Sequence, residues 1–303
     1  MRSLRAGRGR NQAQPGEVGS PVRFAAFIAL LLALGFGAGA ASAAGDARIA
    51  AVQIALHQRG LYAGTIDGLD SAETRQAVLV LQRRKGLVPD GTIGPKTLAA
   101  LGGHATPGAR VLARRMHGLD VAALQFALAW HGFPCGWFDG TFGWHTEHAL
   151  RRFQRWAGVS VDGIAGSTTV AALGRALPVS PIMLVYPVPA VIGDPFGPRG
   201  ARFHAGVDLV ADAGTPVTAA AAGRVKWAAW HDGGWGNLVV ISHGNGVRTL
   251  YAHLSRIDVR RGQRLETGSK VGLVGATGDA TGPHLHFEVR VRGAAVDPLT
   301  ALR

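Results

Sequence analysis

HAGVD at residues 204–208 is the stretch of sequence that most constrains the fold of this chain. Side chains of a β-strand point alternately to opposite faces, so this stretch, read as a strand, places His204, Gly206 and Asp208 together. The residues between them and just after them are apolar and form the other face. The pattern predicts a sheet with a buried back and a front that carries metal-ligand side chains.

HLH at residues 284–286 repeats this pattern later in the chain, because His284, His286 and Glu288 share a strand face that is backed by apolar residues. Two neutral imidazoles and one carboxylate are a ligand set that leaves a zinc ion open to water, whereas a structural site is closed by a fourth ligand, usually Cys. The single cysteine, Cys135, lies far away in the sequence. The composition therefore predicts a catalytic zinc site. Ordinary packed or surface histidines remain the alternative on spacing alone.

Three longer motifs surround these stretches. They are FGPRGARFHAGVDLVADAGTPVTAAAAGRV at 196–225, GGWGNLVVISHGNGVRTLYAHLS at 233–255 and VGATGDATGPHLHFEVRVRGAAVDP at 274–298. Together they closely resemble the lysostaphin-type (LytM-like) zinc metalloendopeptidases, which cut peptide bonds in bacterial peptidoglycan. The resemblance implies a metalloprotease domain with one bound Zn²⁺.

The resemblance also implies a role for each of five residues. His204, Asp208 and His286 match the zinc ligands of the family. His253 and His284 match its catalytic histidines, which do not bind the metal. One of these two imidazoles accepts the proton of the attacking water and the other stabilises the oxyanion, and the sequence does not say which does which.

The strand that contains His253 also shows an alternating pattern, in which Thr249, Tyr251 and His253 share one face. The remaining histidines lack such a context, and we expect them to be surface residues or hydrogen-bonded core residues. One of them, His243, lies in the motif HGNG.

Upstream, the chain repeats itself: residues 49–102 align without a gap with residues 121–174, so that Gln53 meets Gln125. This duplication predicts two small modules, and helical apolar spacing broken by Asp-Gly turns predicts three short helices in each. The pattern is similar to the three-helix peptidoglycan-binding domain of cell-wall hydrolases. Three tryptophans of the second copy are candidates for stacking on sugar rings, unless they fill the core; they are Trp137, Trp144 and Trp156.

The amino terminus predicts export. Arginines precede an apolar run at 24–40, which is followed by Ala-Ser-Ala at 41–43, a small-residue cleavage site. We expect a cleaved signal peptide, with an uncleaved signal anchor on the outer face of the membrane as the alternative. No later segment is long and apolar enough to form a membrane span, so we expect a secreted, cell-wall or periplasmic protein.

These observations predict a multidomain α plus β chain. The expected parts are a signal peptide at 1–44, peptidoglycan-binding modules at 45–102 and 106–175, a proline-containing linker at 176–189, and a β-rich antiparallel-sheet zinc peptidase domain at 190–303.

The net charge of +13 suggests an anionic partner. No basic helix interleaved with aromatic residues supports nucleic acid, so attraction to anionic cell-wall polymers is the favoured interpretation. A single cysteine excludes an intramolecular disulfide, and we expect Cys135 to be a buried thiol.

The sequence thus predicts an exported peptidoglycan hydrolase that cuts a peptide bond in the stem peptide or cross-bridge. A D-alanyl–diaminopimelyl cross-link is the favoured bond, and a Gly–Gly bridge is the narrower alternative. The competing hypothesis is a non-catalytic wall-binding regulator or scaffold that retains the metal site. Intact His253 and His284 argue against it, since a scaffold needs neither.

Overall fold

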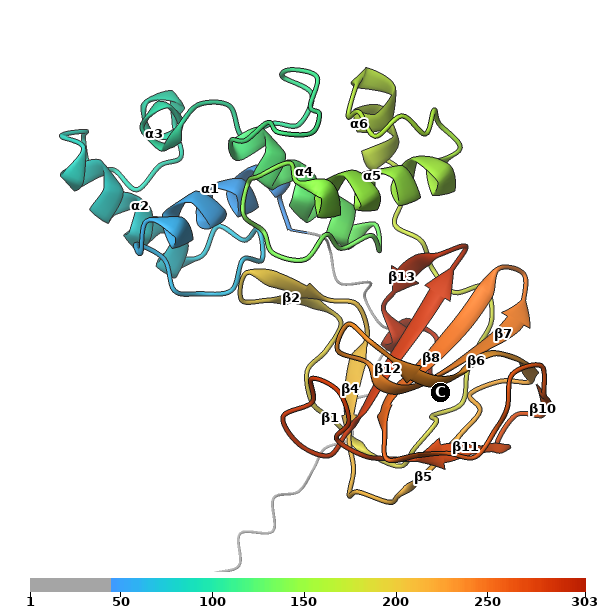
Figure 1. Ribbon diagram of the computed structural model, residues 1–303. Helices are drawn as coiled ribbons and strands as arrows, with labels where there is room; N and C mark the ends of the chain where they lie inside the picture. Colours follow the sequence, from blue (N-terminus) through green and yellow to red (C-terminus); the bar gives the residue numbers. More distant parts are fainter. Residues whose placement is uncertain (1–44) are drawn as a thin grey trace, which may run out of the picture. The chain divides into compact units, whose positions relative to one another are not determined.

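A computed structural model of the protein describes residues 45–303 (Figure 1). The signal peptide predicted at 1–44 lies outside these residues. Within residues 45–303, six α-helices come first and antiparallel β-strands follow, which confirms the predicted α plus β class. Among the helices of residues 45–303, none has the length and apolar character needed to cross a membrane.

Each repeat forms three helices, as predicted. The first contains α1 (Ala47–Gln58), α2 (Ala72–Arg84) and α3 (Pro95–Leu101). The second contains α4 (Leu119–Trp130), α5 (Trp144–Ala157) and α6 (Ser167–Leu173). Local signals fix their ends: the Ser71 side chain accepts a hydrogen bond from Thr74 N at the start of α2, and Gly158 ends α5 in the left-handed region.

Identical residues of the two repeats form a buried hydrogen-bond network, in which a Gln side chain joins an Asp, a Thr and the backbone amide of a Gly. Gln53 Nε2 donates to Asp67 Oδ1 at 2.8 Å and to Thr74 Oγ1 at 3.0 Å, and Gln53 Oε1 accepts from Gly68 N at 2.8 Å. The same arrangement recurs at Gln82, Gln125 and Gln154. Because an unpaired buried amide costs about 1–3 kcal/mol, the identities between the repeats are explained by stability.

The carboxyl-terminal part is built from thirteen strands. They are β1 (Val191–Ile192), β2 (Gly197–Arg199), β3 (Arg202–His204), β4 (Val207–Val210), β5 (Pro216–Thr218), β6 (Gly223–His231), β7 (Gly236–Gly244), β8 (Val247–Leu254), β9 (Arg256–Ile257), β10 (Arg264–Leu265), β11 (Lys270–Leu273), β12 (Leu285–Val291) and β13 (Ala294–Val296). The main sheet has the order β1-β4-β12-β8-β7-β6-β10, with β13 paired to β12. All of its pairs are antiparallel.

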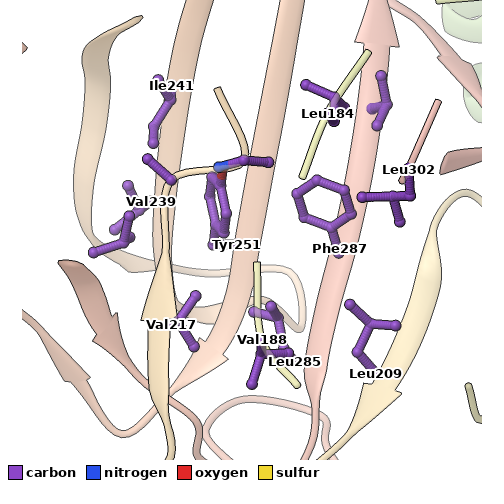
Figure 2. Close-up of a cluster of buried hydrophobic side chains, with 14 of the residues drawn as sticks. Leu184, Val188, Leu209, Val217, Val239, Ile241, Tyr251, Leu285, Phe287 and Leu302 are labelled. Atoms are coloured by element: carbon purple, nitrogen blue, oxygen red, sulfur yellow. The ribbon is translucent and has the colours of Figure 1, made fainter. Parts of the chain in front are cut away.

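Strand register gives the main sheet a buried back and a functional front. On the back, Phe287 of β12 lies opposite Val207 of β4 and Tyr251 of β8, and all three are fully buried. Figure 2 shows Phe287 and Tyr251 within this cluster. On the front, His286 lies opposite Asp208 of β4. The apolar alternation seen in the sequence therefore corresponds to real core residues.

Part of the expected linker at 176–189 belongs to the peptidase core. Leu184 and Val188 are each 2% exposed and join the buried cluster of the main sheet. Leu184 N donates to Ala301 O at 2.9 Å, and Arg303 N donates to Leu184 O at 2.9 Å. Proline-rich composition suggested a tether, but apolar side chains between the prolines dock this segment on the sheet.

The hairpin of β2 and β3 is held by the helical residues, which belong to the same compact unit. Ala201 and Phe203 are buried in the hydrophobic cluster formed by α1 and α4. The ring of Trp130 meets that of Phe203 edge-on at 5.4 Å between centroids. This packing fixes the end of β3, which carries His204.

Candidate metal centre and active site

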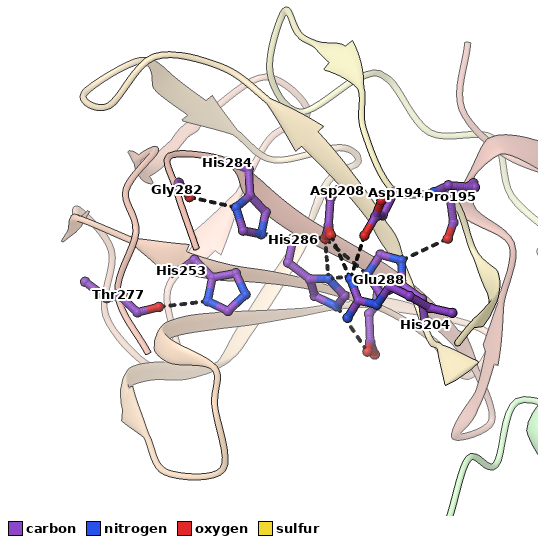
Figure 3. A network of polar contacts seen from close by, with 11 residues as sticks. Asp194, Pro195, His204, Asp208, His253, Thr277, Gly282, His284, His286 and Glu288 are labelled. Atoms are coloured by element: carbon purple, nitrogen blue, oxygen red, sulfur yellow. Dashed lines mark hydrogen bonds and ion pairs between the residues drawn. The ribbon is translucent and has the colours of Figure 1, made fainter. Parts of the chain in front are cut away.

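Three donor atoms from separate strands face one another on the front of the main sheet (Figure 3). His286 Nδ1 lies 2.8 Å from Asp208 Oδ1 and 2.9 Å from His204 Nε2, and His204 Nε2 lies 3.1 Å from Asp208 Oδ1. Both histidines are buried and Asp208 is largely buried. The structure therefore brings together the three residues that the resemblance marks as metal ligands.

The predicted strand through HAGVD is two strands, because β3 ends at His204 and β4 begins at Val207. Gly206 lies in the break, where a Cβ atom would come within 2.4 Å of Phe287 O and 3.0 Å of His286 Cε1. The break and the missing side chain let His204 and Asp208 approach β12 from different directions.

The outer nitrogen of each imidazole is committed to an acceptor. His204 Nδ1 lies 2.9 Å from Pro195 O, and His286 Nε2 lies 3.4 Å from Glu288 Oε1. If these nitrogens donate, His204 Nε2 and His286 Nδ1 both present lone pairs to the same point, where only a cation satisfies both. A tetrahedral zinc ion with bonds of 2.0–2.1 Å separates its ligand atoms by about 3.3 Å, close to the observed spacing. The donor set fits zinc and leaves a position open.

The charges of the cluster also favour a cation. Burial alone would lower the pKa of His286, but its hydrogen bonds to Asp208 and Glu288 raise it to about 9. Burial alone would raise the pKa of Asp208, but His204 and His286, when the nitrogens that face it carry protons, donate hydrogen bonds that hold this pKa well below its usual range; a zinc ion would replace those protons. Both shifts have one cause: each carboxylate stabilises a positive charge beside it, and each positive charge stabilises the carboxylate.

His253 and His284 lie beside this cluster. Their ring centroids are 4.8 Å apart, and the His253 ring is 5.9 Å from that of His286. His253 Nδ1 lies 2.8 Å from Thr277 O, and His284 Nδ1 lies 2.9 Å from Gly282 O. Donation to these carbonyls leaves a lone pair on Nε2 of each ring. Burial is the main reason that the pKa of His253 is lowered, so its imidazole is neutral at pH 7.

The predicted alternation around His253 is wrong. Thr249 and Tyr251 point into the core, whereas His253 joins the front of the sheet. Between the pairs Val239–Tyr251 and Asn237–Leu254, β8 has one residue more than β7, and His253 has a φ of 61°. This β-bulge reverses the alternation and turns the imidazole toward the site.

His284 also differs from the strand prediction, since it precedes β12 and forms an isolated bridge with Gly275. His243 lies apart from the centre. Its ring contacts Ala222 O at 2.9 Å and Thr249 Oγ1 at 2.7 Å, which is an ordinary structural role.

Two charged residues of the site received no role from the sequence. Glu288 is 1% exposed. Its Oε2 accepts a hydrogen bond from Arg290 Nε at 2.6 Å, and its Oε1 contacts His286. Arg199 Nη1 lies 3.3 Å from Asp208 Oδ2 and 2.9 Å from Asp194 Oδ2. Both residues lie in the quoted motifs, but only long-range pairing shows what they contact.

Two hollows meet at the donor cluster. One has a volume of about 650 Å³ and the other of about 890 Å³. Both are lined by Arg199, His253, Asp279 and His286. The donor cluster therefore lies between two hollows that open beside it.

A buried His₂Asp donor set with an open position, flanked by two further histidines on an antiparallel sheet, defines the zinc metallopeptidase class. Residues 202–298 match peptidase family M23, and residues 45–101 and 117–173 each match a peptidoglycan binding domain. The chain carries a domain of peptidase family M23 behind two peptidoglycan-binding domains.

Named relatives agree with this. The DD-carboxypeptidase/endopeptidase Mpg of Neisseria meningitidis is 45% identical over 115 residues, which are 36% of this chain and 26% of that protein. The peptidoglycan DD-endopeptidase ShyA of Vibrio cholerae is 46% identical over 98 residues, which are 32% of this chain and 23% of that protein. The chain thus spans only about a quarter of the length of these relatives.

Solved structures are similar over a comparable share of the chain. The catalytic domain of lysostaphin from Staphylococcus simulans is 34% identical, and the match covers 36% of this chain and 90% of that chain, with a TM-score of 0.35. A zinc-containing peptidase from Vibrio cholerae is 39% identical, and the match covers 38% of each chain, with a TM-score of 0.36.

Proposed function

We propose that this protein is an exported zinc endopeptidase that hydrolyses a peptide bond in the stem peptide or cross-bridge of peptidoglycan. One observation carries the proposal: His204, Asp208 and His286 converge on one point, while His253 and His284 stand beside it with free ring nitrogens. A metal site that served only structure would need neither of these two histidines.

The roles of the residues follow from their contacts. When bound by His204, Asp208 and His286, zinc supplies Lewis acidity toward a carbonyl oxygen and lowers the pKa of a water at its open position. His253 and His284 are held in one tautomer by backbone carbonyls, with Nε2 available to the site. One of them accepts a proton from the attacking water. The other, once protonated, donates a hydrogen bond to the developing oxyanion.

A D-alanyl–diaminopimelyl cross-link is the bond we propose, since ShyA and its relatives ShyB and ShyC are named as peptidoglycan DD-endopeptidases. A Gly–Gly bridge is the narrower alternative.

The helical modules support peptidoglycan as the partner. Trp137 and Trp144 are 56% and 55% exposed and are available to stack on sugar rings, whereas Trp156 packs against the core of its module. Action outside the cytoplasm, in the wall or periplasm, follows from the predicted signal peptide. The basic chain would add attraction to anionic wall polymers.

Variants of the five residues test the proposal. Zinc content and release of fragments from purified sacculi are measured for alanine variants of His204, Asp208, His286, His253 and His284. The three ligand variants should lose zinc and activity together. His253→Ala and His284→Ala should keep zinc and lose about 10²–10⁴ in rate.

His243→Ala is the matched control, because this histidine is also largely buried but lies outside the site. Mass spectrometry of the fragments identifies the bond. If the wild type releases no fragments while binding zinc and sacculi, the protein is the non-catalytic regulator or scaffold. If His284→Ala loses zinc and His286→Ala keeps it, the roles of these two residues are exchanged.

A further inference from the structure

Arg199 stands at the metal centre with most of its hydrogen-bonding capacity unused. It ends β2, and its Nη1 is held by Asp194 Oδ2 at 2.9 Å and by Asp208 Oδ2 at 3.3 Å. Among the described residues, 45–303, Nε and Nη2 have no hydrogen-bond partner, and the side chain is 53% exposed. Nε and Nη2 form the planar fork that binds a carboxylate through two parallel hydrogen bonds.

The position of Arg199 in the groove makes this fork accessible to substrate. Arg199 lines both hollows, and it is the only Arg or Lys among the residues that line the smaller one. The other fixed charges there are carboxylates, from Asp194, Asp208 and Asp279. Arg202 lines the larger hollow, but its guanidinium is stacked 3.7 Å from the ring of Trp137.

A D-alanyl–diaminopimelyl cross-link has a free carboxylate next to its scissile amide, which is a group that this fork can bind. The scissile nitrogen is bonded to a carbon that also bears a free carboxylate, so that carboxylate must enter the site beside the metal. A Gly–Gly bridge has no such group. The contact of Nη1 with Asp208, a proposed ligand, puts the fork next to the reacting amide.

We propose that Arg199 is a specificity residue, which binds the free carboxylate of the residue on the amine side of the scissile bond. This inference rests on the proposed peptidase function and narrows its substrate to cross-links that bear this carboxylate. Asp194 acts as a positioning residue, since it holds Nη1 and so aims the remaining donors into the groove.

The test compares two synthetic cross-linked muropeptide dimers, identical except that the carboxylate beside the scissile amide is free in one and amidated in the other. The zinc-loaded full chain should cleave the free form with a kcat/KM about 10–100-fold higher, as expected for a charge-assisted bidentate contact. Arg199→Gln should lower kcat/KM for the free form and bring the ratio between the two substrates close to 1. Arg199→Lys keeps the charge without the fork and should retain part of the preference.

Arg202→Gln is the matched control, because Arg202 lies opposite Arg199 in the same hairpin but is engaged with Trp137. It should keep the wild-type ratio. Zinc affinity is measured for every variant, since a residue that merely supported Asp208 would lower zinc affinity and slow both substrates equally.

Equal loss on both substrates in Arg199→Gln would overturn the inference. So would a wild type that cleaves the two dimers equally well, which would leave the proposed peptidase function intact. A wild type that cleaves neither dimer nor sacculi would refute the proposed function and the inference with it.

Discussion

Replacing Glu288 with Gln should weaken zinc binding although Glu288 touches no metal. Burial alone would raise the pKa of Glu288, but Arg290 and His286 lower it, so the buried side chain is a carboxylate at neutral pH. Its Oε1 orients His286 through Nε2. Loss of such a partner typically costs 10–100-fold in metal affinity, or about 1.4–2.7 kcal/mol. The separation of 3.4 Å is long for a hydrogen bond, so we expect about 10-fold.

Zinc affinity is measured by competition with a chromophoric chelator at fixed pH. Glu266→Gln is the matched control, because Glu266 is exposed and follows β10, which carries no residue of the site. Thermal unfolding without metal separates a local effect from general destabilisation. Unchanged zinc affinity in a folded Glu288→Gln variant would refute the view that this carboxylate holds His286 in its metal-binding tautomer.

Two further predictions concern the folded state. His253 has a φ of 61°, where a side chain costs about 1–2 kcal/mol relative to glycine, so His253→Gly should resist denaturant better than His253→Ala; the reverse order would contradict the bulge. Burial lowers the pKa of His131 and of His243 from 6.5, so the unfolded chain binds their protons more readily than the folded one. The two neutral histidines therefore make their full contribution to the free energy of unfolding above pH 6.5, and this contribution is lost as the pH falls below 6.5. Urea titrations between pH 6.5 and 5.5, below the range in which the raised pKa of His286 has the opposite effect, should show this decline, with a smaller slope in His131→Gln and in His243→Gln; equal slopes would count against it.

Local patterns were enough for much of the fold. The ungapped repeat predicted two modules of three helices. Helical apolar spacing and Asp-Gly turns are local signals, each visible within a few consecutive residues. Alternation predicted the buried back of the sheet, where Val207 and Phe287 lie. The same alternation failed at His253, since a bulge depends on how many residues the neighbouring strand offers and not on the strand itself.

The linker shows a second limit of local patterns. Proline content is a property of composition, and it predicted a tether at 176–189. Whether Leu184 docks depends on the sheet that other parts of the chain build. The expectation for Cys135 was confirmed, because its thiol is buried in the hydrophobic core of the second module. A free thiol packs in such a core as a small apolar group.

The sequence by itself determined the candidate residues: two His-rich stretches, their strand character and the chemistry of a His₂Asp donor set. Only the tertiary structure decided which atoms converge. His286 Nδ1 meets Asp208 Oδ1 because β12 pairs with β4 in one register, and a shift of one residue would turn one of these two side chains to the opposite face. Arg199 and Glu288 acquire their roles in the same way. Their partners are brought to them by strand pairing across the sheet and by packing of the β2–β3 hairpin, and no periodicity along the chain encodes those long-range contacts.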